Sequence, residues 1–288
     1  MWKKIITVSL VLVIILSFSA CTSGSGGETG LLSAQEIVND AIESWDDIRT
    51  YQYDMEMNID MAGEVGGEVG EATIVMDFSG AIDDENRKMR MDVTMSMVAT
   101  GEDELELAMD MYLISDMMYA GMEAPEIGTM WVKSEMPEGY LEHMNQVKAQ
   151  IEFVEAAQVE VIGNEKVRGV DCYILQLTPD MGQLWQLVIQ QSDMTGKGVL
   201  PEIDVENILE MFQSFSVKQW IAKDTHFLTK TEIAMLLELT PTAMGFPEEK
   251  GLITMDITMY LLAYDYNQPV SIELPPEAEE AVEVPSWF

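Results

Sequence analysis

The sequence predicts a single α+β domain in which a curved antiparallel sheet of about ten strands holds helices against one face. Two observations support this fold class. Apolar and polar residues alternate with period two through much of the chain, and short turn-like segments separate the alternating runs. A few stretches instead carry apolar residues at helical spacing, and each of them must bury an apolar stripe. Large open sheets twist and curl, so we expect this sheet to have a concave side.

The N-terminal residues predict export and lipidation. Two lysines precede the apolar run IITVSLVLVIIL and then small residues, which is the organisation of a secretory signal peptide over residues 1–20. The segment FSAC, which ends at Cys21, resembles a prokaryotic lipobox, and that resemblance implies a lipidated Cys21 at the mature N-terminus. Residues 21–32 would then be the lipidated cysteine and a flexible tether rich in glycine and serine. The alternative is an ordinary signal peptide followed by a chance cysteine.

The domain is expected to span residues 33–288 and to begin with an amphipathic helix. Ser33 fits the N-cap and Glu36 the third helical position, which together make a capping box. The next segment, YQYDMEMNIDM at residues 51–61, alternates without a break between apolar and polar side chains. Successive side chains of a strand point to opposite faces, so this segment predicts a long strand with one apolar and one acidic face.

Further strands should follow as an antiparallel meander. They are expected at EATIVMDFSGAI, KMRMDVTMSMV and ELELAMDMYLI, with GEVGGEVGE, DENR and TGED as turns, and in a shorter pair around MMYAGM and TMWVKSEM. A helix should then begin at Pro137 and continue to residue 154.

The second half of the domain repeats this mixture. We expect strands in VEVIGNEKVRGVDCYILQLT with NEKVRG as a turn, helical stretches at DMGQLWQLVIQQ and DVENILEMFQSF, a hairpin about Lys223 and Asp224, and a last long strand in GLITMDITMYLLAYDY. The tail at residues 269–288 is rich in proline and glutamate and is expected to pack loosely.

The composition restricts the partners and the redox chemistry. The chain has 51 acidic and 15 basic residues, a formal net charge of −36, and such a surface repels nucleic acid and anionic lipid headgroups. Solubility alone also explains this charge. If Cys21 carries lipid, Cys172 is the remaining thiol and no internal disulfide can form. Cys172 lies in the strand-like segment VDCYILQL and is expected to be a small buried residue.

The order of elements resembles the LolA/LolB-like superfamily of lipoprotein-sorting proteins, and especially its LppX/LprG-like branch. The resemblance is carried by IVNDAIESWDDIRTYQYDMEMNIDM, VRGVDCYILQLTPD, VKQWIAKDTHFLTKTEIAM and YNQPVSIELPPEAEEA. It implies an open half-barrel that wraps helices around a hydrophobic cavity for acyl chains. The many methionines and the heavy negative charge depart from that family, so the resemblance does not identify the ligand.

No catalytic motif is found in the sequence. His143 and His226 lack the spacing of a metal pair, and there is no nucleophile elbow, P-loop or dinucleotide fingerprint. Paired carboxylates are uninformative in so acidic a chain. We therefore expect no enzyme activity, no metal and no cofactor.

The unusual chemical feature is the number of methionines, 24 in the chain. Met-x-Met pairs recur in the predicted strands, where both side chains of a pair share one face. Thioether sulfur suits Cu(I), which makes a copper carrier a formal alternative, but apolar residues interleave with the pairs and no histidine joins them. Methionine is flexible and suits a cavity that accepts flexible chains, although the protein's own helices could instead fill that space. The residues expected to line a cavity are Met55, Met57, Ile59, Met89, Met91, Met95, Leu107, Met109 and Met111.

Two functions from different classes follow. The first is a lipoprotein of the cell envelope, extracytoplasmic and anchored to the membrane through Cys21, that binds a lipid, an acyl chain or a similar hydrophobic ligand in the manner of a carrier. The second is a sensor or scaffold of the same fold that binds a protein partner in the envelope. Neither hypothesis involves nucleic acid.

Overall fold

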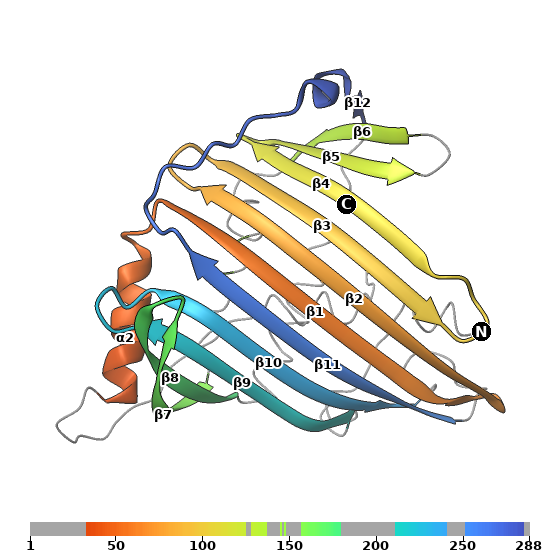
Figure 1. The fold of residues 1–288 in the computed structure, drawn as a ribbon, viewed down its shortest axis with the longest axis horizontal. Helices are drawn as coiled ribbons and strands as arrows, with labels where there is room; N and C mark the ends of the chain where they lie inside the picture. Colours follow the sequence, from red (N-terminus) through yellow and green to blue (C-terminus); the bar gives the residue numbers. More distant parts are fainter. Residues whose placement is uncertain are drawn as a thin grey trace.

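The computed structural model describes residues 33–124, 128–136, 145, 147, 157–179, 211–240 and 251–284. Within these ranges, the helix α2 (Ala34–Trp45) packs against one sheet of 12 strands, which Figure 1 shows as a broad twisted layer. The strands are β1 (Thr50–Val65), β2 (Glu68–Asp83), β3 (Lys88–Ala99), β4 (Leu105–Ile114), β5 (Met117–Ala124), β6 (Gly128–Glu135), β7 (Ala157–Val167), β8 (Val170–Pro179), β9 (Phe212–Ala222), β10 (Leu228–Leu239), β11 (Gly251–Tyr264) and β12 (Val282–Glu283). A short 3-10 helix, η1 (Pro276–Glu280), precedes β12.

The sheet consists of two antiparallel meanders that meet at β1 and β11. Its strand order is β12-β6-β5-β4-β3-β2-β1-β11-β10-β9-β8-β7, and β12 alone pairs in parallel, with β6. The order has two ends, so the sheet is curved but not closed into a cylinder. The predicted antiparallel meander is confirmed, with 12 strands in the described ranges where about ten were expected.

The two faces of the sheet differ as the alternation in β1 predicts. Tyr51, Tyr53, Met55, Met57, Ile59 and Met61 are all buried, whereas the polar residues between them are partly or largely exposed. We call the face that carries these buried residues the inner face. Burial of each such side chain contributes about 1.5–3 kcal/mol, so the inner face supplies much of the stability of the domain.

The predicted first helix is confirmed at its N-terminus. The Ser33 Oγ accepts a hydrogen bond from the Glu36 backbone N–H at 3.2 Å, and the Glu36 carboxylate accepts one from the Ser33 N–H at 2.6 Å. These two bonds form the capping box and satisfy two backbone donors that the first helical turn leaves free. The apolar side of α2, with Ile37, Val38 and Ala41, is buried in the same core as the inner face.

The outer face is mostly polar but carries two small apolar clusters. In the first, Tyr112 and Trp131 pack under the C-terminal tail, which contributes Ile272, Ala278 and Ala281 and runs past the ends of the strands to β6 (Figure 1). Residues 269–284 therefore pack against the sheet, although their proline and glutamate content predicted loose packing.

The second cluster holds the β7–β8 hairpin against the outer face. Val167, Cys172 and Trp220 are buried together, and the Trp220 indole N–H donates to Glu165 Oε2 at 2.7 Å. The guanidinium carbon of Arg168 lies 3.9 Å from the centroid of the Tyr264 ring, a cation–π contact. The predicted burial of Cys172 is confirmed.

Two predicted turns are shorter than expected. GEVGGEVGE contains only the turn Gly66–Gly67, because two residues with positive φ, here 60° and 83°, suffice to close a hairpin and the flanking residues pair in strands. NEKVRG likewise reduces to Arg168 and Gly169, with φ of 49° and 88°.

One predicted helix is partly wrong. DVENILEMFQSF was expected to be helical, but β9 begins at Phe212 and pairs with β10. Pairing with a neighbouring strand overrides the local helical spacing there. The helices expected at 137–154 and 180–191 lie almost wholly outside the described residues, so the helix-wrapped cavity is not established.

Replacement of Gly121 tests the packing of the tail cluster. A Cβ at this position would lie 2.6 Å from Cζ2 of Trp131, closer than real atoms approach. We expect Gly121→Ala to lower the free energy of unfolding by about 1–3 kcal/mol in urea titrations, because the indole must move. Gly163→Ala is the matched control, since its Cβ would meet only Ile174 Cδ1 at 3.6 Å. Equal losses in both variants would contradict the proposed packing.

Candidate functional site

The predicted lining residues all lie on the inner face. Met57 stands opposite Met76 on β2, Met76 opposite Met95 on β3, and Met95 opposite Leu107 on β4. A parallel row joins Met55 through Phe78 and Val93 to Met109. The structure thus brings residues from three distant segments onto one surface, as the period-two pattern predicted.

The exposure of these residues rises from β1 towards β4. Met55, Met57, Ile59, Met89 and Met91 are buried, with 7% exposure or less. Met95, Met109 and Met111 are only partly buried, and Leu107 is 36% exposed. The same face therefore changes from a closed core to an accessible apolar surface within a few strands.

We call the accessible part the apolar shelf, and it includes residues that the sequence interpretation missed. Leu105 and Met130 are each 48% exposed, while Met97 and Met122 are partly buried. Leu105 lies opposite Met97, and Met122 lies opposite both Met109 and Met130. Extension of period two to the end of β3 and through β4, β5 and β6 would have found them. The shelf consists of Met95, Met97, Leu105, Leu107, Met109, Met122 and Met130.

Exposed apolar surface of this kind is uncommon on a soluble domain and often marks a binding site. Methionine makes the surface adaptable, because its unbranched side chain has three rotatable bonds.

A buried hydroxyl lies on the same face and has no counterpart in the sequence prediction. Tyr53 is 0% exposed, and its Oη has no hydrogen-bond partner among the residues that the structure describes. Burial of a hydroxyl without a partner costs about 1–3 kcal/mol. Burial also raises the pKa of Tyr53 well above its ordinary value, so the hydroxyl remains protonated.

The hydroxyls of two neighbouring tyrosines find hydrogen-bond acceptors within the chain. The Tyr51 hydroxyl donates to Asn145 Oδ1 at 2.5 Å, and the Tyr266 hydroxyl donates to the Leu228 carbonyl at 2.5 Å. The Tyr51 ring lies 6.2 Å from that of Tyr53 and 5.8 Å from that of Tyr266, so the three form one aromatic group. Tyr53 is thus the unsatisfied member of this group.

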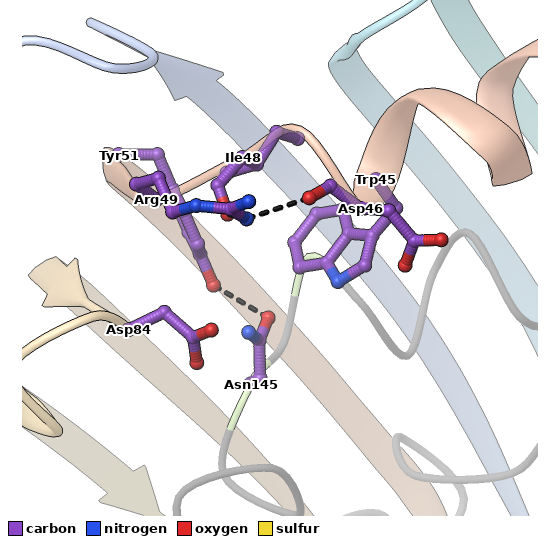
Figure 2. Close-up of a pocket in the computed structure, with 7 residues that line it drawn as sticks. All are labelled: Trp45, Asp46, Ile48, Arg49, Tyr51, Asp84 and Asn145. Carbon is purple, nitrogen blue, oxygen red and sulfur yellow. Dashed lines mark hydrogen bonds between the residues drawn. The ribbon is translucent and has the colours of Figure 1, made fainter.

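A small polar pocket lies where α2 leads into β1 (Figure 2). It has a volume of about 160 Å³ and is lined by Trp45, Asp46, Ile48, Arg49, Tyr51, Asp84 and Asn145. The Arg49 guanidinium donates to the Asp46 carbonyl at 2.6 Å, and the Tyr51 hydroxyl points to Asn145. The pocket offers both hydrogen-bond donors and acceptors. Its seven lining residues include no cysteine or serine that could act as a nucleophile and no histidine that could act as its base.

The described part of the chain contains no group of three or more His, Cys, Asp or Glu residues placed to hold a metal ion. His226 Nε2 lies 3.6 Å from one carboxylate, that of Asp40, while His143 lies outside the described residues. Cys172 Sγ lies 3.7 Å from Thr229 Oγ1, and burial raises the pKa of the thiol, so the reactive thiolate is disfavoured. None of the helices in the described ranges is long and apolar enough to cross a membrane.

The fold and the site define an α+β protein with one open sheet and an apolar inner face. The chain belongs to the family described as "Family of unknown function (DUF6612)", which matches residues 33–283. No curated protein matches the sequence.

Among solved structures, the chain is similar to the Mycobacterium tuberculosis lipoprotein LppX, with 12% identity, a TM-score of 0.37 and coverage of 82% of this chain and 96% of that one. It is also similar to LprF from Mycobacterium bovis, with 11% identity, a TM-score of 0.39 and coverage of 84% and 96%. A LolA superfamily protein from Nitrosomonas europaea matches with 13% identity, a TM-score of 0.23 and coverage of 85% and 96%. Members of the superfamily that the sequence resembles are therefore among the matches. These identities and TM-scores are too low to transfer a ligand or a partner to this chain.

The outer face opposite the site carries closely spaced carboxylates. Asp92 and Asp110 lie directly opposite each other on β3 and β4, and Arg90, which forms an ion pair with Asp92, offsets part of their charge. Partial burial, and then the hydrogen bond and charge of Asp92, raise the pKa of Asp110 above its ordinary value of 3.8. The folded state therefore binds this proton more tightly than the unfolded state, and ionised Asp110 opposes folding.

We expect Asp110→Asn to raise the melting temperature by a few degrees at most at pH 7, because Asp110 is largely exposed and screened. The gain should disappear near pH 3, where the carboxyl is protonated in both folded and unfolded chains. Thermal unfolding followed by circular dichroism at both pH values measures this. Asp103→Asn, in the turn after β3, controls for the loss of one negative charge, and an equal gain in that variant would contradict the specific role of Asp110.

Proposed function

We propose that this protein is a non-enzymatic binding protein of the cell envelope, anchored through a lipidated Cys21, that holds a lipid or another ligand with an acyl chain on its inner face. The observation that supports the proposal most strongly is the apolar shelf, where the methionine-rich face of β3 to β6 remains accessible beside a closed core. A rigid core would gain little from methionine at these positions.

The energetics of such a ligand are favourable. Each methylene moved from water to an apolar surface contributes about 0.8 kcal/mol, so a chain of a dozen methylenes could bind with useful affinity after the costs of ordering. Flexible methionines can follow chains of different length and unsaturation. The same surface would reject a charged ligand, since a carboxylate or ammonium ion buried there would have no partner.

The ligand face is tested by a charge placed on the shelf. We expect Leu107→Asp to lower the affinity for a fluorescent fatty acyl probe at least tenfold in titrations of the recombinant soluble domain, because the carboxylate would face the chain. Val98→Asp is the matched control: Val98 is 49% exposed, and it lies opposite Thr73 on the outer face. It adds the same charge and should leave the affinity unchanged.

Equal affinities in the wild-type protein and both variants would contradict the placement of the ligand on the shelf. Absence of co-purified lipid in mass spectra, together with no uptake of the probe, would contradict ligand binding itself. Capture of a protein partner that survives delipidation would then favour the alternative function, a sensor or scaffold in the envelope.

The membrane anchor has its own test. Cys21 lies outside the described residues, and we expect Cys21→Ala to move the protein from the membrane fraction to the soluble fraction and to remove the mass of the lipid from the mature chain. Cys172→Ala is the control, because Cys172 is 0% exposed and should have no part in anchoring. Retention of Cys21→Ala on membranes would show that another segment anchors the protein.

A further inference from the structure

The described residues do not explain the burial of the Tyr53 hydroxyl. Phenylalanine at this position would fill the same space and would bury no unsatisfied group. The hydroxyls of Tyr51 and Tyr266, the other two members of the aromatic group, both donate to acceptors within the chain. No acceptor among the described residues meets the Tyr53 Oη, so the hydroxyl is open to an acceptor that a ligand supplies.

The position of Tyr53 connects it with the methionines. It stands opposite Gly80 on β2, and Gly80 stands opposite Met91 on β3, which stands opposite Met111 on β4. The ring lies across Gly80: a Cβ there would be 2.5 Å from Cε1 and Cζ of Tyr53 and 2.7 Å from its Oη. The glycine thus lets the tyrosine ring lie across β2, the strand that separates β1 from β3.

The chemistry of the site limits the external group. A protonated tyrosine hydroxyl has one O–H donor and an oxygen that also accepts, and an acceptor on the ligand would satisfy the donor. No lysine or arginine is buried among the described residues, and a carboxylate or phosphate held there would lack a counterion. A neutral acceptor, the carbonyl oxygen of an ester, satisfies the hydroxyl without burial of a charge.

We infer that Tyr53 is a specificity-determining residue, whose hydroxyl donates a hydrogen bond to the ester carbonyl of an acyl ligand that lies along the methionines of β3 and β4. This inference rests on the proposed function and extends it: the acyl chain lies on the apolar shelf, and its ester end enters the adjoining closed part of the inner face, where Tyr53 and Met91 are buried. It predicts a preference for esterified acyl chains over plain hydrocarbons.

The test compares Tyr53→Phe with the wild-type protein for two probes of similar length, methyl hexadecanoate and n-hexadecane. Each probe competes with the bound hydrocarbon fluorophore diphenylhexatriene, which has no carbonyl group. We expect Tyr53→Phe to bind the ester about fivefold more weakly, the effect of one neutral hydrogen bond, and to bind the alkane unchanged. The variant should unfold at the same temperature as the wild-type protein or higher, because it loses an unsatisfied hydroxyl.

Tyr266→Phe is the matched control. It removes a hydroxyl that the Leu228 carbonyl already satisfies, so it should lower the melting temperature and leave the ratio of ester to alkane affinity unchanged. A second measurement uses the wild-type protein alone: the infrared carbonyl stretch of bound, ¹³C-labelled methyl hexadecanoate should lie at lower frequency than in hexane.

The outcomes separate this inference from the proposed function. If the wild-type protein binds both probes but Tyr53→Phe binds the ester as tightly as before, or loses both probes equally, the role of Tyr53 is overturned and ligand binding stands. A carbonyl stretch at its frequency in hexane overturns the hydrogen bond in the same way. If the wild-type protein binds neither probe, the proposed function is overturned, and the role of Tyr53 with it.

Discussion

The structure depends on the burial of one face of a single sheet. β1 is the centre of this arrangement, because it pairs along its length with β2 on one side and β11 on the other and so joins the two meanders. A shift of one residue in either pairing would turn every methionine of β1 to the solvent and every carboxylate to the core. The contrast between apolar odd positions and polar even positions in YQYDMEMNIDM therefore fixes the register, and the register fixes the lateral rows from which the candidate site is built.

Much of this arrangement could be predicted because it is local. The capping box of α2, the alternation of β1 and the hairpin about Lys223 and Asp224 each depend on residues a few positions apart, and all of them are present. The start of β9 at Phe212 could not be predicted in this way, because its pairing with β10 overrides the helical spacing of the residues before it. The packing of the tail was missed for a similar reason, since Ile272 is buried by Tyr112 and Trp131, far away in the sequence.

For the candidate site, the sequence predicted which face of the sheet the residues lie on but not how exposed they are. Period two placed the lining residues on one face, but exposure depends on what covers each strand, and no local pattern separates the buried Met57 from the exposed Leu107. The hydroxyl of Tyr53 was hidden for another reason: tyrosine at an apolar position of a strand is ordinary, and its missing partner is visible only when the neighbours are in place.

The inner face departs from the rules of a stable core in three ways that occur together. It uses methionine where branched side chains would pack more rigidly, and it leaves part of the surface exposed on β4 and β6. It also buries the Tyr53 hydroxyl over Gly80 without a hydrogen-bond partner among the described residues. Each departure lowers stability, and each lies on the same face of the sheet. The outer face also exposes apolar side chains, among them Val69 and Val98, but it covers its two apolar clusters with the C-terminal tail and the β7–β8 hairpin. Natural sequences break such local rules mainly where function requires it, so the concentration of all three on the inner face favours a ligand there over a core that is merely loosely packed.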